Sequence, residues 1–373
     1  MTNLVYPGAT HTRFQHALGA MHLMEMAIGV IRSKNHQVSF HEEEAALIAI
    51  LLHDIGHGPF SHTLEPSLLP AIPHEDMSVL LMNELNGQFG GKLSLAMDIF
   101  SDRYHKRFLH QLVTGQLDMD RLDYLKRDSF YTGVTEGVIG SDRIIKMLNV
   151  YEDQLVVEGK GIYSIEKFLI ARRLMYWQVY FHKTVLAAEI LLTMVLKRAR
   201  ELVVNGEKLF SSPYLKFFLE DNINFSSVNI FSDSPAVKQL INNFVNLDDD
   251  DIMSAAKVWS GHPDRILSLL SGWFTGRSLY RLEFNETDFS QNTITELRQA
   301  AASQYDVPFD ETGYFVYSGN ISNYAYRAED EKIRILFNTG VLADISVASD
   351  MLNVSVLSKT VKKYFLCYPK DLG

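Results

Sequence analysis

One stretch of ten residues gathers many of the chain's reactive side chains: His53-Asp54-Ile55-Gly56-His57-Gly58-Pro59-Phe60-Ser61-His62. It follows directly on Ala45 to Leu52, an apolar segment that predicts a buried helix. A cation at the end of that helix could take an imidazole nitrogen from His53 and a carboxylate oxygen from Asp54. If the helix continues, His57 returns to the same face as His53.

A metal site is the better interpretation of this stretch. An isolated histidine is more often an ordinary core or surface residue, but here ten residues hold four potential ligands, and His16 and His74 stand in flanking segments. Calcium prefers oxygen ligands alone, so the mixed set favours another divalent ion such as Mn, Fe, Zn, Ni or Mg. The lone cysteine, Cys367, disfavours a structural zinc site. The pattern does not choose among these metals.

Composition narrows the class of protein. The 373 residues, 47% of them hydrophobic, suffice for one large core or two to three smaller ones. The apolar runs near Ala45 and Val185 fall short of the ~20 residues of a membrane span, and the first residues do not resemble a secretion signal. One cysteine forms no intrachain disulfide, so we expect a cytoplasmic protein without a membrane segment. The net charge of −10 argues against bulk binding of nucleic acid.

The first two thirds of the chain are expected to be helical. Apolar residues recur at helical spacing in five segments: Phe14 to Ile31, Glu42 to Leu52, Met77 to Leu85, Leu169 to Val179 and Ala187 to Leu202. Glycines and prolines, among them Gly56, Pro66 and Pro73, predict the connections. The acidic run Asp248 to Asp251 is interpreted as the start of a helix rather than a cation site.

The pattern changes after about Gly276. Four short strands are predicted at Tyr280 to Phe284, Tyr314 to Tyr317, Ile333 to Phe337 and Lys363 to Tyr368, with one helix from Thr293 to Gln304. We therefore expect a mainly α protein, with a helical core over residues 1–275 and a smaller α+β domain over residues 276–373. The reactive residues place the metal and substrate site within residues 1–185.

The spacing of the ligand candidates resembles a known family. His16, the His53-Asp54 pair and the distant Asp120 resemble the H, HD, D signature of HD-domain phosphohydrolases. Three longer sequence motifs are more specific. Tyr6 to His16 (YPGATHTRFQH), His53 to His62 and Asp118 to Asp128 (DMDRLDYLKRD) resemble the deoxynucleoside triphosphate triphosphohydrolases, including the vertebrate enzyme with a SAM domain. The resemblance covers about Leu4 to Lys183, roughly half the chain.

The resemblance implies a role for each matching position. The implied metal ligands are His16, His53, Asp54 and Asp120. The implied catalytic residues on the phosphate side are His57, His62, Glu65 and His74, with Glu65 paired to His74 where the vertebrate enzyme has aspartate. Arg13, Arg121 and Arg172 would hold the triphosphate, and Tyr124, Asp128 and Tyr180 would contact the deoxyribose. Phe181 stands where relatives have glutamine, which leaves base selection open.

Helical spacing gives independent support to one of these groups. Arg172, Tyr176 and Tyr180 follow one another at four-residue steps, so one helix face offers a cation for phosphate and rings for a sugar or base. The alternative is a solvated arginine beside core tyrosines. Lys126 and Arg127 are interpreted as surface charges.

The expected reaction is metal-assisted hydrolysis at the α-phosphorus, with His74 or His62 protonating the departing 5′-oxygen. The products would be a deoxynucleoside and tripolyphosphate. Two other classes stay open: an HD phosphohydrolase of another phosphoester, such as a nucleoside monophosphate, cyclic nucleotide or alarmone, and a non-catalytic regulator that binds nucleotides.

Two further expectations come from the resembling enzymes. They assemble, so we expect a homo-oligomer. They also carry a few dozen residues, including a Gln-Leu-Gly turn, before the motif that begins here at Tyr6, whereas only Met1 to Val5 precede it. We expect either an internal start, the favoured explanation, or a wall supplied by another subunit.

Overall fold

Side-chain caps fix where the first two long helices begin. Thr12 and Gln15 form a capping box at the start of α1 (Arg13–Ser33), and Ser39 and Glu42 form another at the start of α2 (Phe40–Leu52). His16 therefore lies in the first turn of α1, while His53 caps the C-terminal end of α2. The helix termini thus place two histidines at the ends of rigid elements.

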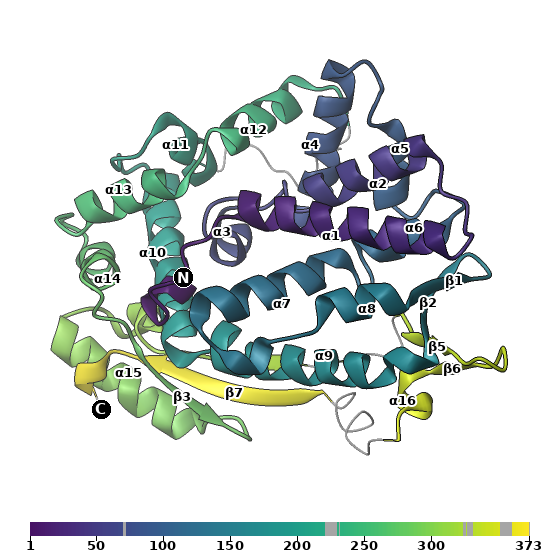
Figure 1. Ribbon diagram of the computed structural model, residues 1–373. Helices are drawn as coiled ribbons and strands as arrows, with labels where there is room; N and C mark the ends of the chain where they lie inside the picture. Colours follow the sequence, from purple (N-terminus) through teal and green to yellow (C-terminus); the bar gives the residue numbers. More distant parts are fainter. Residues whose placement is uncertain are drawn as a thin grey trace.

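The computed structural model describes residues 1–69, 72–220, 230, 232–323, 326, 331–350 and 360–372. These ranges are mainly helical (Figure 1). The other α-helices are α3 (Ser61–Leu68), α4 (His74–Gln88), α5 (Ser94–Phe100), α6 (Arg107–Val113), α7 (Met119–Thr132), α8 (Ser141–Met147), α9 (Ile162–Met175), α10 (Lys183–Val204), α11 (Pro213–Leu219), α12 (Pro235–Val245), α13 (Asp249–Trp259), α14 (Arg265–Thr275), α15 (Gln291–Tyr305) and α16 (Ile345–Ala348). A π-helical turn, η4 (Tyr176–Tyr180), follows α9 directly.

The strands form two small sheets. The first has the order β1-β2-β5-β6, from β1 (Leu148–Tyr151), β2 (Gln154–Glu158), β5 (Arg334–Leu336) and β6 (Leu342–Asp344). The second has the order β3-β7-β4, from β3 (Arg281–Asn285), β7 (Val361–Tyr368) and β4 (Tyr317–Asn323). Figure 1 shows β7 running beneath α9, with β5 and β6 beside the β1–β2 hairpin.

The first sheet joins parts of the chain that are far apart in sequence. Val157 of β2 pairs in parallel with Ile335 of β5, so a C-terminal strand extends a hairpin within the helical region. Glu152 and Asp153 turn that hairpin with positive φ values of 50° and 56°, the conformation that tight two-residue hairpin turns require. The predicted division at residues 275 and 276 stays a prediction.

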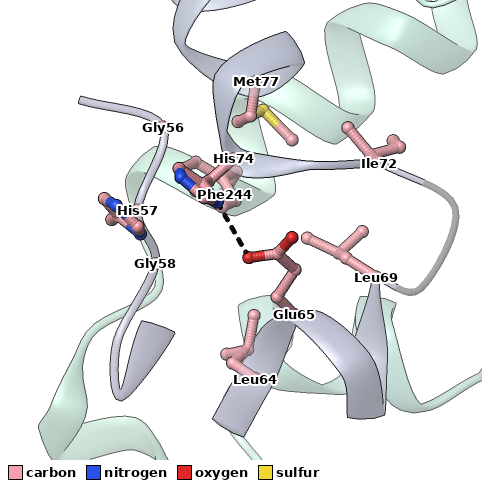
Figure 2. A pocket seen from close by; sticks show the side chains of 10 residues that line it. All are labelled: Gly56, His57, Gly58, Leu64, Glu65, Leu69, Ile72, His74, Met77 and Phe244. Atoms are coloured by element: carbon pink, nitrogen blue, oxygen red, sulfur yellow. Dashed lines mark hydrogen bonds and ion pairs between the residues drawn. The ribbon is translucent and has the colours of Figure 1, made fainter. Parts of the chain in front are cut away.

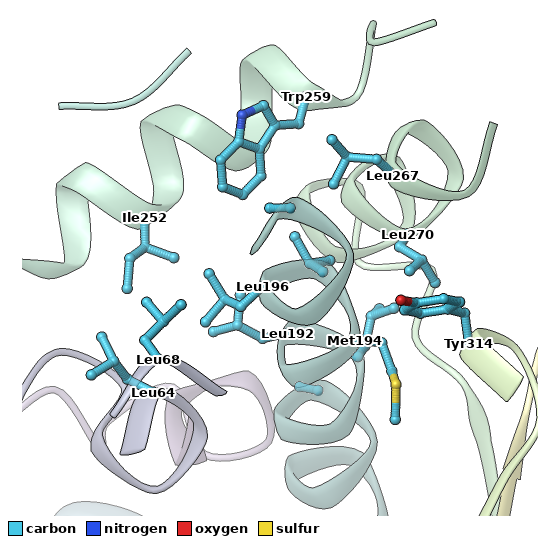
Figure 3. Close-up of a cluster of buried hydrophobic side chains, with 14 of the residues drawn as sticks. Leu64, Leu68, Leu192, Met194, Leu196, Ile252, Trp259, Leu267, Leu270 and Tyr314 are labelled. Atoms are coloured by element: carbon cyan, nitrogen blue, oxygen red, sulfur yellow. The ribbon is translucent and has the colours of Figure 1, made fainter. Parts of the chain in front are cut away.

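Buried apolar side chains gather in two clusters. One lies between α1, α2, α7 and α9, with fully buried Met24, Ile50 and Phe168. The other surrounds α10 and joins α3, α13 and α14 to the second sheet; Figure 3 shows Leu192 and Leu196 of α10 facing Trp259 and Ile252 of α13. The reactive stretch 53–62 therefore connects α2 in the first cluster to α3 in the second.

Most predicted elements are confirmed. The five helical segments lie within α1, α2, α4, α9 with η4, and α10, and the predicted strands at Tyr280, Ile333 and Lys363 match β3, β5 and β7. The helix predicted from Thr293 is α15. Asp248 caps α13 in a capping box with Asp251, which confirms the interpretation of the acidic run.

Four local predictions were wrong or incomplete. The strand predicted from Tyr314 begins only at Tyr317, the first residue of β4. Tyr314 instead ends a 3-10 helix, with its side chain buried in the core and its backbone outside the sheet. Pro66 lies inside α3 rather than in a connection. Proline removes one intrahelical hydrogen bond, but burial of Leu64 and Leu68 against α10 stabilises the helix. The chain turns after Leu52, so His57 is not on a continued helix. The β1–β2 hairpin was not predicted.

Among the described residues, no single helix is long and apolar enough to cross a membrane. The segments Gly159–Tyr180 and Lys183–Val204 reach that length and composition only together, with a bend of 57° between them.

Candidate metal centre and active site

Three ligand atoms from three different helices converge at one point. Nε2 of His16 lies 3.0 Å from Oδ1 of Asp120, and Nε2 of His53 lies 3.4 Å from the same oxygen. His16, His53 and Asp120 each offer one ligand atom, and these three atoms lie within 4.8 Å of one another. Such a group of two imidazoles and a carboxylate is suited to a divalent metal ion.

The ring of His16 is fixed on its far side by a second carboxylate. Its Nδ1 lies 2.8 Å from Oδ2 of Asp123, and Asp123 accepts two hydrogen bonds from Arg127, at 2.8 and 2.9 Å. Gly19 makes room for this pair, because a Cβ there would lie 2.1 Å from both side chains. A carboxylate behind a histidine ligand fixes its tautomer and ring orientation.

The ring of His53 is also oriented toward the same point. Its Nδ1 lies 2.6 Å from the carbonyl oxygen of Ile50 and donates to it, which leaves Nε2 as the lone-pair nitrogen. That Nε2 is buried and makes no hydrogen bond to any described residue. A buried nitrogen without a donor, beside the oxygen of Asp120, fits a site that takes a cation.

The carboxylates and imidazoles of the site shift one another's pKa values. Burial opposes protonation of His16, but the carboxylates of Asp120 and Asp123 outweigh it and raise the pKa of His16 to about 10. Burial likewise acts against ionisation of Asp120, yet His16 and His53 lower its pKa well below the usual range. Positive charge is therefore strongly favoured at this point, and a divalent metal ion would supply it in place of protons.

Asp54 points partly away from this cluster. Its Oδ2 accepts a hydrogen bond of 2.6 Å from Arg13, while its Oδ1 lies 3.5 Å from Nε2 of His53 and 3.4 Å from Nε2 of His57. Burial raises its pKa, but His57, His53 and Arg13 together lower it far below the usual value. Asp54 is thus an ionised carboxylate at the edge of the cluster, within reach of it, and its role as fourth ligand stays a prediction.

The candidate catalytic histidines lie beside this group. The rings of His57 and His74 stack with their centroids 4.0 Å apart, and Nδ1 of His74 lies 3.1 Å from Oε2 of Glu65. Figure 2 shows this contact between Glu65 and His74, and Phe244 of α12 lines the same pocket. The pairing implied for Glu65 and His74 is therefore present in the geometry. His62 belongs to α3, but its side chain lies outside the described residues.

A glycine lets the reactive loop approach α4 closely. A Cβ on Gly56 would lie 2.2 Å from the carbonyl oxygen of His74 and 2.4 Å from the backbone nitrogen of Ser78. The Ser78 hydroxyl links the two segments, since it accepts from the Gly56 N–H at 3.0 Å and donates to the carbonyl of His53 at 2.9 Å. This contact positions His53 and His57 relative to His74.

Two of the three predicted phosphate-binding arginines are largely buried. Arg172 is only 5% exposed, and its Nη1 donates to Oε1 of Gln116 at 3.1 Å. The interpretation of Arg172 as a solvated arginine is therefore wrong. Arg121 lies in the first turn of α7, next to Asp120, and donates to the carboxylate of Asp118 and to the carbonyl of Gly115.

The residues implied for the sugar side form one hydrogen-bonded group. The Tyr180 hydroxyl donates to Oδ2 of Asp128 at 2.6 Å, and Nε2 of His11 lies 2.8 Å from the other oxygen. The Tyr124 ring lies 6.0 Å from that of Tyr180 and 6.5 Å from that of His16. Burial raises the pKa of Tyr180 well above its ordinary value, and Asp128 adds to this, so its hydroxyl stays a donor.

Sequence reasoning missed three residues that support the site. Asp123 and Arg127 orient His16, and His11 holds Asp128. Arg127 was interpreted as a surface charge, which is wrong because it is held against Asp123 with 18% of its side chain exposed. The helical spacing contained part of this signal: Asp120, Asp123 and Arg127 follow at steps of three and four on α7.

Two regions of this chain match known protein families. The model of the HD domain matches residues 13–127, and that of the HD associated region matches residues 139–214. The solved structure of a phosphohydrolase from Bacteroides thetaiotaomicron VPI-5482 is 53% identical, with a TM-score of 0.92 over 98% of this chain and 90% of that one. The uncharacterized protein YwfO of Bacillus subtilis (strain 168) is 31% identical over 100% of this chain and 84% of its own.

This chain belongs to the HD-domain phosphohydrolase family. More distant relatives are named for their substrate. The "Deoxynucleoside triphosphate triphosphohydrolase SAMHD1 homolog" of Dictyostelium discoideum is 27% identical over 56% of this chain and 44% of its own length.

Proposed function

We propose that this phosphohydrolase converts deoxynucleoside triphosphates to deoxynucleosides and tripolyphosphate. One observation carries the proposal: the Tyr124 ring contacts both the Tyr180–Asp128 pair, which suits a sugar hydroxyl, and the metal group, since its centroid lies 6.0 Å from that of Tyr180 and 6.5 Å from that of His16. A site for a nucleotide sugar beside a site for a metal fits hydrolysis at the α-phosphorus better than cleavage of the terminal phosphate.

His16, His53 and Asp120 would hold the metal ion, with Asp54 as the fourth ligand. A bound divalent ion would lower the pKa of a coordinated water and stabilise charge on the phosphoryl oxygens.

The arginines would bind the triphosphate. Arg172 and Arg121 are fixed by Gln116 and Asp118, so their guanidinium groups are ordered before substrate binds. Charge-assisted bonds from arginine to phosphate are strong, and ordering them in advance lowers the entropic cost of binding.

His74 would protonate the departing 5′-oxygen. Its Nδ1 faces Glu65, which fixes the ring. Its Nε2, which lies 3.2 Å from the exposed carboxylate of Glu75, would carry the proton. Stacking on His57 places that ring toward the Asp54 side of the group. Asp128 would accept a hydrogen bond from the sugar 3′-hydroxyl, with Tyr180 and His11 holding the carboxylate in place.

The distant relatives support the same substrate class. Besides the Dictyostelium protein, the human "Deoxynucleoside triphosphate triphosphohydrolase SAMHD1" is 27% identical over 48% of this chain, and the stretch from Tyr6 to Tyr180 carries the motifs on which the proposal rests.

The test is a substrate panel with product identification. Purified protein is incubated with each deoxynucleoside and ribonucleoside triphosphate, and with monophosphates, cyclic nucleotides and alarmones, at several divalent metals. Ion-exchange separation should reveal tripolyphosphate and deoxynucleoside. Release of pyrophosphate or orthophosphate, or turnover confined to another phosphoester, would instead support a different phosphohydrolase. Nucleotide binding without turnover at every metal would support a regulator.

A further inference from the structure

The loop between α6 and α7, residues 114–118, lies against both arginines of the proposed phosphate site. It follows the last turn of α6 and ends at Asp118, the N-cap of α7. Gln116 and Asp118 are 8% and 0% exposed, so this short connection is buried rather than solvated. Buried polar side chains in a loop must have partners, and here the partners are Arg172 and Arg121.

Gln116 contacts Arg172 from a different part of the chain. Its Oε1 accepts from Nη1 of Arg172 at 3.1 Å, and the two residues are 56 positions apart. Gln116 also lines a small cavity together with Val156 of β2 and Ile333, while the residue stays 8% exposed. The side chain of Gln116 is therefore well placed to set the position of the guanidinium.

Asp118 performs the corresponding task for Arg121. Its Oδ1 accepts from the backbone N–H of Arg121 at 2.7 Å, and its Oδ2 accepts from the backbone N–H of Gly115 at 2.9 Å and from the Arg121 guanidinium. The carbonyl of Gly115 accepts from the same guanidinium. Nε of Arg121 is buried with no partner among the described residues, so a donor remains for an anion.

We propose that residues 114–118 form a positioning loop, in which Gln116 fixes Arg172 and Asp118 fixes Arg121 so that both cations meet the triphosphate in a preset geometry. The inference rests on the proposed function, because it takes the two arginines as phosphate ligands. Neither Gln116 nor Asp118 touches the substrate. Each acts through its arginine, so its loss should weaken phosphate binding more than it slows the chemical step.

Gln111 offers a matched control for Gln116. It is also a buried glutamine beside the same cavity, 6% exposed, but its partners are the N–H of Leu155, at 2.6 Å, and the side chains of Gln154 and Glu331. The same Gln→Leu change at the two positions removes the same chemistry, and only one of the two touches an arginine of the site.

The experiment measures binding of inorganic tripolyphosphate by calorimetry at a fixed free metal concentration, with steady-state kinetics on the best substrate. Gln116→Leu should weaken tripolyphosphate binding and raise KM by up to about tenfold, and by no more than Arg172→Ala does, because Gln116 acts only through that arginine. The value of kcat should change by less than about threefold. Gln116→Glu keeps an acceptor and should restore binding to within about threefold of wild type.

Gln111→Leu should lower the melting temperature at least as much as Gln116→Leu but leave tripolyphosphate affinity within about threefold of wild type. Asp118→Asn, which keeps one acceptor for the helix cap, should weaken tripolyphosphate binding while the protein still folds. A general structural defect would reduce the active fraction and hence kcat in both glutamine variants, and would not separate them.

Two outcomes separate the inference from the proposed function. Unchanged tripolyphosphate affinity in Gln116→Leu, together with a clear loss in Arg172→Ala, would overturn the positioning role alone. Wild-type protein that binds tripolyphosphate but hydrolyses no deoxynucleotide would overturn the proposed function, and a loss in Gln116→Leu would still support the positioning role.

Discussion

Nδ1 of His16 lies 2.8 Å from Oδ2 of Asp123, across 107 positions of sequence. The contact joins the first turn of α1 to the middle of α7 and directs the opposite nitrogen of the ring at Asp120. The metal group therefore depends on a carboxylate that is not itself a candidate ligand. Arg127 in turn holds this carboxylate.

Asp123→Ala should weaken metal binding without abolishing it. Loss of a carboxylate behind a ligating histidine typically costs 10–100-fold in metal affinity or activity. Titration of manganese into metal-depleted protein measures the change. Arg127→Ala, which removes only the support of Asp123, should cost less. Wild-type affinity in Asp123→Ala would show that the His16 ring is oriented by its packing alone.

Asp120→Ala should abolish both tight metal binding and hydrolysis while the helical fold persists, because Asp120 supplies the oxygen shared by both histidines. Asp54→Ala should do the same if Asp54 is the fourth ligand. Metal content by elemental analysis and helicity by circular dichroism are the measurements. The control is Asp142→Ala, an exposed aspartate on α8. Full activity of either site variant at limiting metal would contradict its assignment.

Arg172→Ala should raise KM by roughly tenfold or more, with little change in metal affinity. The expected contact is a charge-assisted bond to phosphate worth ~1.5–3 kcal/mol, and ~1.4 kcal/mol corresponds to one decade. Lys167→Ala, an exposed cation on the same helix, is the control for loss of general positive charge. An unchanged KM would remove Arg172 from the substrate site.

Gly56→Ala should both destabilise the protein and disrupt the active site. Its Cβ would lie 2.2 Å from the carbonyl oxygen of His74, a backbone atom that cannot rotate away. We expect a loss of roughly 2–4 kcal/mol of unfolding free energy, measured by urea denaturation, and a large loss of turnover. Gly29→Ala in α1, where nothing lies within 4 Å, should be neutral or slightly stabilising. Equal stability of the two variants would contradict the close approach of α4.

Stability should depend on pH through Glu42, away from the active site. Burial acts to raise its pKa, but Lys106, Tyr104 and the capping contacts with Ser39 lower it to about 2. Since the folded pKa lies below the ordinary value, the stabilising contribution is present above about pH 5 and is lost as the pH falls toward 2. Glu42→Gln should cost on the order of 1–3 kcal/mol at pH 7.

The gap in unfolding free energy between wild type and Glu42→Gln should narrow between pH 6 and pH 3. Denaturation series at several pH values measure it. A gap that stays constant over this range would show that the contribution of Glu42 comes from packing rather than from its charge.

The sequence alone determined the local structure of the helical part. Apolar spacing predicted the long helices, and capping residues such as Ser39 and Asp248 agree with where α2 and α13 begin. These features depend on neighbours within a few residues, so a linear pattern contains them. The ligand candidates His16, His53 and Asp120 were also found in the sequence, because their residue types and motif are unusual.

Only the tertiary structure decided which side chains meet. The pairing of β2 with β5, the contact of His16 with Asp123 and the bond of Gln116 to Arg172 each join segments that are far apart in sequence. Their formation depends on how helices pack around the two cores, and no local periodicity records that packing. The short β1–β2 hairpin escaped prediction for a related reason: its stability comes from β5 and from the core beneath it rather than from its own few residues.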